Sequence, residues 1–221
     1  MSASSPSPDH DARDSSDPLA AYRSAVRSLG PGFGATLWAS PATQILRFDV
    51  LIDLLGPHRL RDRVVLDLGC GDAALGQRLL DRGIKVGRYV GIDGVLEQVE
   101  SARGRGLADA TLVCEDLLAS PGSLGRFGGE VALISGTLNT MSEEQARTLV
   151  AEAFSSVSIG VGFNFLSDRP ASHRRDSDLG PARRHDVLGW IDFALSLSPL
   201  VSFRQDHLEG HDAAILVTHH T

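Results

Sequence analysis

Short runs rich in valine, isoleucine and leucine alternate along this chain with longer stretches in which apolar residues recur every three or four positions. The short runs are typical of strands buried on both faces of a parallel sheet, and the longer pattern is that of amphipathic helices. Their alternation predicts an α/β domain with a mostly parallel sheet. We expect strands at residues 64–67, 89–93, 111–114, 131–134 and 159–165, and helices at 43–55, 73–82, 95–103, 142–154 and 187–197.

The two ends of the chain differ from this alternating pattern. Residues 1–18 are rich in serine, proline and aspartate without apolar clustering, which predicts a disordered tail. A short helix is expected over 19–30, and two strands at 200–204 and 213–218 predict a closing hairpin. At 221 residues the chain is long enough for one sizeable domain, which we place at residues 19–221.

Composition narrows the classes of function. A net charge of −7 argues against nucleic-acid binding as the main role. The start of the chain lacks the basic and hydrophobic segments of a signal peptide, and no apolar run is long enough for a membrane span. Cys70 and Cys114 do not make a disulfide framework, so we expect reduced thiols in a cytoplasmic protein. The histidines lack metal-ligand spacing, and no metal is expected.

The first strand runs into a glycine-rich turn, and this segment organises the rest of the chain. Asp67 stands at the strand's carboxyl end, followed by Gly69 and Gly71. Glycines here allow a positive φ or a close backbone approach that a side chain would block. A ligand against this turn would meet bare backbone and the start of the next helix, while Asp67 could accept hydrogen bonds from a cationic or hydroxyl-bearing group.

Polar residues follow the next strands at the same position. Asp93 ends the second strand, Asp116 follows the third, and Ser135-Gly136 follows the fourth. Because the carboxyl ends of parallel strands face one crevice, we expect these residues to share a site with Asp67. Asp93 also stands at the distance from the glycines at which an acidic residue reaches ribose hydroxyls.

The segment Asp67-x-Gly69-x-Gly71 resembles the first motif of class I S-adenosylmethionine-dependent methyltransferases, with Ala73 where a third glycine is common. The resemblance spans roughly residues 38–218. It implies a Rossmann-like fold with a mostly parallel seven-stranded sheet, helices on both faces and a terminal antiparallel hairpin. It also implies S-adenosylmethionine as cofactor, with Asp116 at the adenine amino group and Leu117 over the ring. The implied cofactor-binding residues are Asp67, Gly69, Cys70, Gly71, Asp93, Gly94, Asp116, Leu117, Ser135, Gly136, Gln44 and Arg47.

The last two of these residues come from a more specific resemblance. The pattern Trp38-x-Ser40-x3-Gln44-x2-Arg47-Phe48, with Ser-Gly-x-x-Asn after the fourth strand, is similar to one bacterial group of these enzymes. Gln44 and Arg47 stand three apart and point the same way on their helix. The resemblance implies that such a polar pair beside the first motif could meet the amino-acid end of the cofactor. A solvated helix face is an equal interpretation of the pair.

Residues that would handle the methyl acceptor are less well marked. The polar loop at 167–183 is either a solvated surface loop or a lid whose arginines grip a carboxylate or phosphate of the acceptor. His173 and His185 are the candidate catalytic bases. Asn139 could orient the acceptor or simply bond its own backbone in a turn.

Together these features predict methyl transfer to a small-molecule acceptor, which can be anionic, with an oxygen, nitrogen or carbon nucleophile. Two alternatives remain: a catalytically silent cofactor- or partner-binding module, and an NAD-dependent oxidoreductase. The oxidoreductase pattern would place an apolar residue where this chain has Asp67, and it would leave Asp116 without a role. The sequence does not indicate the oligomeric state.

Overall fold

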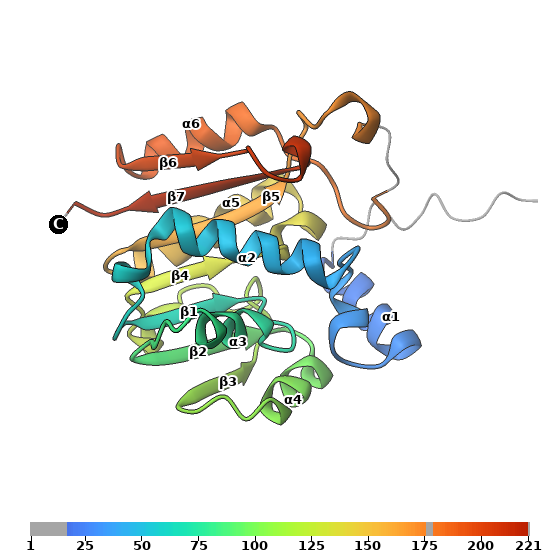
Figure 1. Ribbon diagram of the computed structural model, residues 1–221, viewed down its shortest axis with the longest axis vertical. Coiled ribbons are helices and arrows are strands. Elements are labelled where there is room, and N and C mark those ends of the chain that lie inside the picture. Colours follow the sequence, from blue (N-terminus) through green and yellow to red (C-terminus); the bar gives the residue numbers. More distant parts are fainter. Residues whose placement is uncertain (1–16, 176–178, 221) are drawn as a thin grey trace, which may run out of the picture.

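The computed structural model describes residues 17–175 and 179–220, which form a seven-stranded sheet flanked by helices (Figure 1). The strand order is β3-β2-β1-β4-β5-β7-β6, and β7 alone among them runs antiparallel to its two neighbours. This confirms the predicted α/β fold with its terminal antiparallel hairpin. The strands are β1 Val64–Leu68, β2 Arg88–Asp93, β3 Ala110–Cys114, β4 Val131–Ile134, β5 Gly160–Leu166, β6 Val201–Arg204 and β7 Asp212–Thr218.

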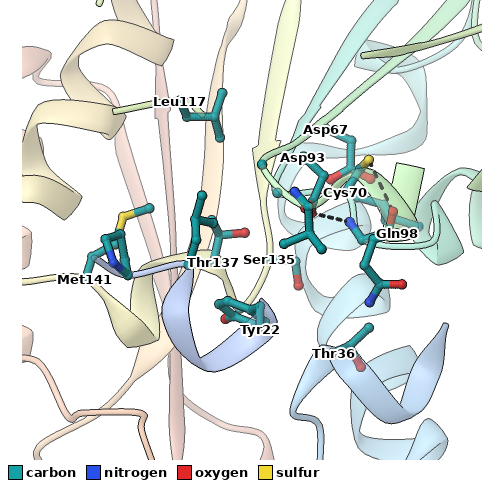
Figure 2. A pocket seen from close by; sticks show the side chains of 18 of the residues that line it. Tyr22, Thr36, Asp67, Cys70, Asp93, Gln98, Leu117, Ser135, Thr137 and Met141 are labelled. Carbon is teal, nitrogen blue, oxygen red and sulfur yellow. Dashed lines mark hydrogen bonds between the residues drawn. The ribbon is translucent and has the colours of Figure 1, made fainter. Parts of the chain in front are cut away.

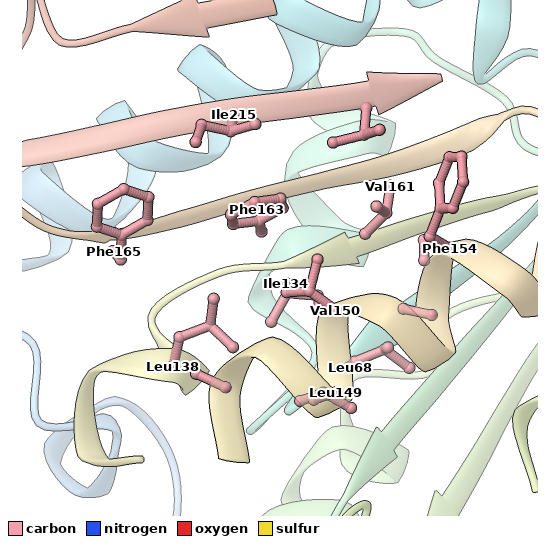
Figure 3. Packing of buried hydrophobic residues seen from close by; sticks show 14 of the residues in the cluster. Leu68, Ile134, Leu138, Leu149, Val150, Phe154, Val161, Phe163, Phe165 and Ile215 are labelled. Carbon is pink, nitrogen blue, oxygen red and sulfur yellow. The ribbon is translucent and has the colours of Figure 1, made fainter. Parts of the chain in front are cut away.

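Helices cover both faces of the sheet because its strands alternate their side chains between two apolar cores. Leu66 and Leu68 of β1 face the core beneath α5 and α6, whereas Val65 faces the core beneath α2 and α3. Figure 3 shows the first core, where Ile134 and Val150 meet between β4 and α5. The helices are α1 Ala20–Leu29, α2 Pro41–Leu55, α3 Ala74–Asp81, α4 Leu96–Gly104, α5 Glu143–Ser156 and α6 Val187–Leu197.

Local sequence signals fix where two of the helices begin. The Ser40 side chain accepts from Thr43 N at the start of α2, and Ser142 and Gln145 form the capping box of α5. Helix α3 packs on its core through Leu75 and Leu79, whereas half of the Leu80 side chain is exposed.

The N-terminal helix α1 does not pack on either of the two main hydrophobic cores. It packs through Ala25 and Val26 on a small cluster with Ala35 and Val95, beyond the edge of the sheet at which β1 and β4 end (Figure 1). Most of the predicted disordered tail, residues 1–16, lies outside the described residues. No helix in the described part of the chain is long and apolar enough to cross a membrane.

Candidate cofactor site

A pocket opens at the carboxyl ends of β1, β2 and β4, and its walls enclose about 840 Å³, open mouth included (Figure 2). It gathers residues from all the strand ends that the sequence singled out, together with residues from α1, α2 and α4. The lining consists of Pro18, Leu19, Tyr22, Thr36, Trp38, Gln44, Phe48, Asp67, Gly69, Cys70, Gly71, Leu75, Asp93, Gly94, Val95, Gln98, Asp116, Leu117, Leu118, Ser135, Gly136, Thr137 and Met141.

The turn after β1 requires glycine for two different reasons. Gly69 has φ +77°, and a Cβ there would lie 2.1 Å from Thr137 Oγ1, whose hydroxyl donates to Leu68 O at 2.9 Å. Gly71 has φ +52° but meets no such crowding, so its conformation is the constraint. Ala73, where the resembled motif often has a third glycine, also has a positive φ of 60°. Ala73 therefore adopts the left-handed backbone conformation, which is less favourable for alanine than for glycine.

Asp93 holds this turn in place. One of its carboxylate oxygens accepts from Gly71 N at 2.8 Å, and the other accepts from Val95 N at 2.9 Å. Burial raises the pKa of Asp93, while these two backbone hydrogen bonds oppose the rise. The carboxylate thus fixes both the glycine turn and the start of α4 from inside the pocket.

Asp67 lies before the end of its strand and is hydrogen-bonded to a neighbouring strand. It lies within β1, and the Tyr89 hydroxyl of the neighbouring strand β2 donates to its carboxylate. The two side chains are diagonal neighbours on one face of the sheet, since Val65 is the residue paired with Tyr89. Burial raises the pKa of Asp67 to about 7, against the opposing effect of the Tyr89 hydrogen bond. Its charge therefore changes near neutral pH.

Two acidic residues follow β3, the predicted Asp116 and its neighbour Glu115, and their side chains have different surroundings. Asp116 lines the pocket beside Leu117, and its Oδ1 accepts from Leu118 N at 3.0 Å and Ala119 N at 3.3 Å. Glu115 is not part of the lining and instead forms an ion pair with Arg126. Asp116 is thus the acidic residue available to a ligand at this end of the pocket.

At the other end of the pocket, Ser135 and Gly136 are fixed by Asn164 of β5. The Asn164 side chain accepts from Gly136 N at 2.8 Å and donates to Ser135 Oγ at 3.1 Å. A Cβ on Gly136 would lie 2.4 Å from the Trp38 ring, so the indole is packed directly against this turn. Trp38 therefore forms part of the pocket wall.

Gln44 and Arg47 were predicted to act together, but the structure brings only Gln44 into the lining. Arg47 is buried behind Trp38, with its guanidinium 4.5 Å from the ring centroid, and its Nε donates to Asp212 at the start of β7. Burial raises the pKa of Asp212 to about 6, although the charge of Arg47 opposes the rise. Arg47 thus supports the indole from behind.

No sequence pattern indicates that α1 contributes to the pocket. Leu19 packs on Gly94, where an added Cβ would lie 2.5 Å from the leucine side chain, and Tyr22 enters the pocket beside Thr140 (Figure 2). Burial raises the pKa of Tyr22 to about 12, so its hydroxyl stays protonated. Gln98 ties the following segment down, accepting from Gly32 N at 2.7 Å and donating to its carbonyl at 3.2 Å.

None of the three candidate catalytic residues lines the pocket. His185 is buried in the core against Phe165 and Trp190, with Nε2 3.1 Å from Leu138 O. His173 is exposed, with Nε2 3.1 Å from Glu209 Oε2. Asn139 accepts from Leu166 N at 2.9 Å, a bond to a distant strand rather than to its own turn. Their roles as base or acceptor contact therefore lack support from this arrangement.

The ionisable groups in the lining are all acidic: Asp67, Asp93, Asp116, Cys70 and Tyr22. Burial raises the pKa of the Cys70 thiol well above its usual range, so it stays protonated and unreactive at neutral pH. The described residues also contain no cluster of three or more histidine, cysteine or acidic side chains that could hold a metal ion. A ligand of this pocket would thus meet negative charge and hydrogen-bond acceptors.

Comparison with known proteins agrees with this geometry. Residues 65–160 match the family model described as a methyltransferase domain. No curated protein matches the chain in sequence. Among solved structures, an O-methyltransferase family protein from Burkholderia thailandensis aligns with TM-score 0.65 and 15% identity over 85% of this chain, which spans 58% of that protein's length.

Two other solved structures align over similar lengths. The magnesium protoporphyrin IX methyltransferase of Synechocystis PCC 6803, with bound S-adenosylhomocysteine, has TM-score 0.60 and 14% identity over 80% of this chain and 84% of its own. An S-adenosylmethionine-dependent methyltransferase from Aquifex aeolicus has TM-score 0.56 and 14% identity over 81% of this chain and 93% of its own. At these identities the alignments establish a shared fold. Residues 65–160 thus match the methyltransferase-domain family, and the chain shares the fold of these solved methyltransferases.

Proposed function

We propose that this chain transfers the methyl group of S-adenosylmethionine to a small-molecule acceptor, on an oxygen, nitrogen or carbon atom. The observation that carries the proposal is the charge of the pocket. Its described lining holds Asp67, Asp93 and Asp116 and has no lysine, arginine or histidine. S-adenosylmethionine carries a sulfonium and an ammonium group, which suit an acidic site. A dinucleotide pyrophosphate would instead meet uncompensated carboxylates.

The residues fit this cofactor along the whole length of the pocket. Asp93 lies at the turn where a carboxylate can accept from ribose hydroxyls, and Asp116 with Leu117 offers an acceptor and an apolar cover for adenine. The turn at Ser135 and Gly136 is held open by Asn164 for the amino-acid end. Each role follows from donor and acceptor chemistry at a described position.

When bound, S-adenosylmethionine supplies an electrophilic methyl group on a positively charged sulfur. The contribution of the chain is to hold donor and acceptor in line and to keep water out. Trp38, Tyr22 and Met141 are large side chains of the lining, and Trp38 lies directly against Gly136, so they suit this aligning role. Alignment alone can supply much of the acceleration of such a displacement.

The described lining contains no histidine that could activate the acceptor, and the carboxylate of Asp67 already accepts from the Tyr89 hydroxyl. The Tyr22 hydroxyl is a donor at neutral pH, because its pKa is raised to about 12. His173 and His185 are engaged elsewhere. These observations favour an acceptor that is already nucleophilic near neutral pH. An anionic acceptor gripped by the 167–183 loop has less support, because Arg174 pairs with Glu209 and Arg184 donates to two carbonyl oxygens.

Calorimetric titration of the purified chain with S-adenosylmethionine, S-adenosylhomocysteine and NADH in parallel tests the proposal. We expect the first two to bind and NADH not to bind. Binding of NADH alone would overturn the proposal in favour of an oxidoreductase. Cofactor binding without turnover against a broad acceptor panel would favour the silent binding module, for which the specific observation is that no histidine is part of the described lining.

The pH dependence of binding provides a further prediction. Asp67 has a pKa of about 7, so it becomes negative as the pH rises through neutrality. The sulfonium distinguishes S-adenosylmethionine from S-adenosylhomocysteine, and an ionised Asp67 attracts it. The ratio of the affinity for S-adenosylmethionine to that for S-adenosylhomocysteine should therefore rise several-fold between pH 6 and pH 8. Half of this rise is expected near pH 7, where Asp67 ionises. Titration of Asp67→Asn, in which Tyr89 can still donate to the amide oxygen, should give a flat ratio. A rise of equal size in this variant would assign the effect to another group.

A further inference from the structure

Tyr89 of β2 leans along the sheet toward the cofactor pocket. It is the second residue of its strand and pairs with Val65, yet its hydroxyl bonds to Asp67, two residues closer to the carboxyl end of β1. Val65 and Asp67 project to the same face of the sheet, so the phenol ring lies along this face. The Tyr89 side chain is buried, and its hydroxyl meets a residue of the pocket lining from inside the protein.

Two glycines leave room for the Tyr89 ring in this position. A Cβ on Gly76 of α3 would lie 2.9 Å from Tyr89 Cζ, the ring atom that carries the hydroxyl, and a Cβ on Gly91 of β2 would lie 3.1 Å from Cε1. Neither glycine has a positive φ, so a larger residue would take space from the ring rather than strain the backbone. The ring is thus held between a helix and the sheet, with its hydroxyl directed at Asp67.

The Tyr89 hydroxyl occupies one oxygen of the Asp67 carboxylate. It donates to Oδ2, and among the described residues this is the hydrogen bond that the carboxylate accepts. Burial raises the pKa of Tyr89 well above its usual range, and the charge of Asp67 adds to the rise, so the hydroxyl stays a donor. The second oxygen, Oδ1, is therefore the one that a ligand can meet.

Apart from Tyr89, the titratable groups nearest to Asp67 are all acidic: Cys70 and Asp72 of the turn after β1, and Asp93 of β2. Burial raises the pKa of Asp67, and the two neighbouring carboxylates add to the rise. Arg105, which follows α4, forms an ion pair with Asp72. Helices α2 and α3 contribute uncharged side chains to this wall: Gln44, Phe48 and Leu75. The Tyr89 hydroxyl is the group that opposes these effects and favours an ionised Asp67.

We propose, on the basis of the methyl transfer proposed above, that Tyr89 is a positioning residue that makes the site prefer S-adenosylmethionine over S-adenosylhomocysteine. By binding Oδ2 it keeps Asp67 ionised and leaves Oδ1 for the ligand. The sulfonium of the methyl donor is attracted to this carboxylate, whereas the thioether of the product is neutral. Such a preference favours exchange of the spent cofactor for a new one. A purely structural role of Tyr89 would stabilise the fold without changing this preference.

Calorimetric titration of the chain with both cofactors at a series of pH values tests the proposal. In the wild type, the ratio of the two affinities should rise around the Asp67 pKa of about 7. Tyr89→Phe removes only the hydroxyl. Because the carboxylate then loses a stabilising hydrogen bond, its pKa increases, and the midpoint of the rise should move up by about 1 to 2 pH units. The ratio at neutral pH should fall several-fold in this variant.

Two matched controls separate this effect from a general loss of packing. Ser198→Ala also removes a buried hydroxyl, which donates to Thr218 O at 2.7 Å and is not part of the pocket, so the midpoint should stay at its wild-type value. Gly76→Ala keeps the hydroxyl but displaces the ring, and its midpoint should move in the same direction as that of Tyr89→Phe. Gly104→Ala, at a helical glycine with open space around it, should not move the midpoint.

A wild-type midpoint in Tyr89→Phe would overturn the proposal, and so would an equal shift in Ser198→Ala. Circular dichroism checks that each variant is folded. If Tyr89→Phe does not fold, Gly76→Ala takes its place, and a midpoint equal to that of Gly104→Ala overturns the proposal. Failure of the proposed function gives a different result, because neither cofactor would then bind the wild-type chain. A wild-type rise that Tyr89→Phe leaves unchanged overturns only the role of Tyr89.

Discussion

Replacing Asp93 by alanine is expected to weaken S-adenosylhomocysteine binding by about 10- to 100-fold, the effect of stranding buried polar groups. The reason is twofold. The variant removes the proposed acceptor for the ribose hydroxyls, and it also frees Gly71 N and Val95 N, which the carboxylate holds at 2.8 and 2.9 Å. The free energy of unfolding should fall by about 2 kcal/mol for the same reason.

Asp93→Asn separates these two effects, because an amide keeps one acceptor oxygen and should give an intermediate loss. The control is Glu97→Gln, which makes the same change of charge on the exposed surface of α4, close to Asp93 in sequence. Calorimetric titration measures affinity, and urea denaturation measures stability. If Asp93→Ala bound S-adenosylhomocysteine as tightly as the wild type, Asp93 would have no role in the cofactor site.

The second large effect is expected at the buried ion pair of Arg47 and Asp212. Both side chains are almost fully buried, so Asp212→Ala leaves the Arg47 charge without compensation. Breaking a buried pair in this way typically costs about 3–5 kcal/mol of the free energy of unfolding. The emission of Trp38, which rests on Arg47, should change as well. Measuring it in a Trp190→Phe background isolates Trp38, since the chain has two tryptophans.

Replacing both partners, by Arg47→Met with Asp212→Leu, should restore much of the lost stability, because no unpaired charge then remains buried. Asp206→Ala breaks the exposed pair with Arg204 and should leave stability nearly unchanged. Urea denaturation of these three variants and the wild type forms the test. A loss at Asp212→Ala no greater than that at Asp206→Ala would mean that the buried pair contributes nothing of this kind.

These two predictions rest on different kinds of information. Asp93 could be identified from the sequence, because a strand followed by an acidic residue and a helix is a local pattern. The pairing of Arg47 with Asp212 joins residues 165 positions apart, and no local pattern relates them. Gln44 and Arg47 look equivalent on one helix face, yet Gln44 lines the pocket while Arg47 turns to β7.

The histidines illustrate the same limit. His173 and His185 follow β5 in a polar segment, which made both plausible bases from sequence alone. Their surroundings differ because β5 and α6 enclose His185 among Phe165 and Trp190, while His173 meets Glu209 from the turn before β7. Exposure and partner choice at these positions depend on how distant segments pack.

The sequence by itself determined the order of strands and helices, the glycine turn after β1, and the acidic residues at the strand ends, because short-range periodicity and turn chemistry encode these features. Only the tertiary structure decided that Tyr22 enters the pocket, that Tyr89 bonds Asp67, and that the outer side of α6 stays exposed. Each of these depends on which segments meet across the sheet. When β1 pairs with β2 and β4, residues that are far apart in the sequence come into contact. No periodic pattern in the sequence relates such residues to one another.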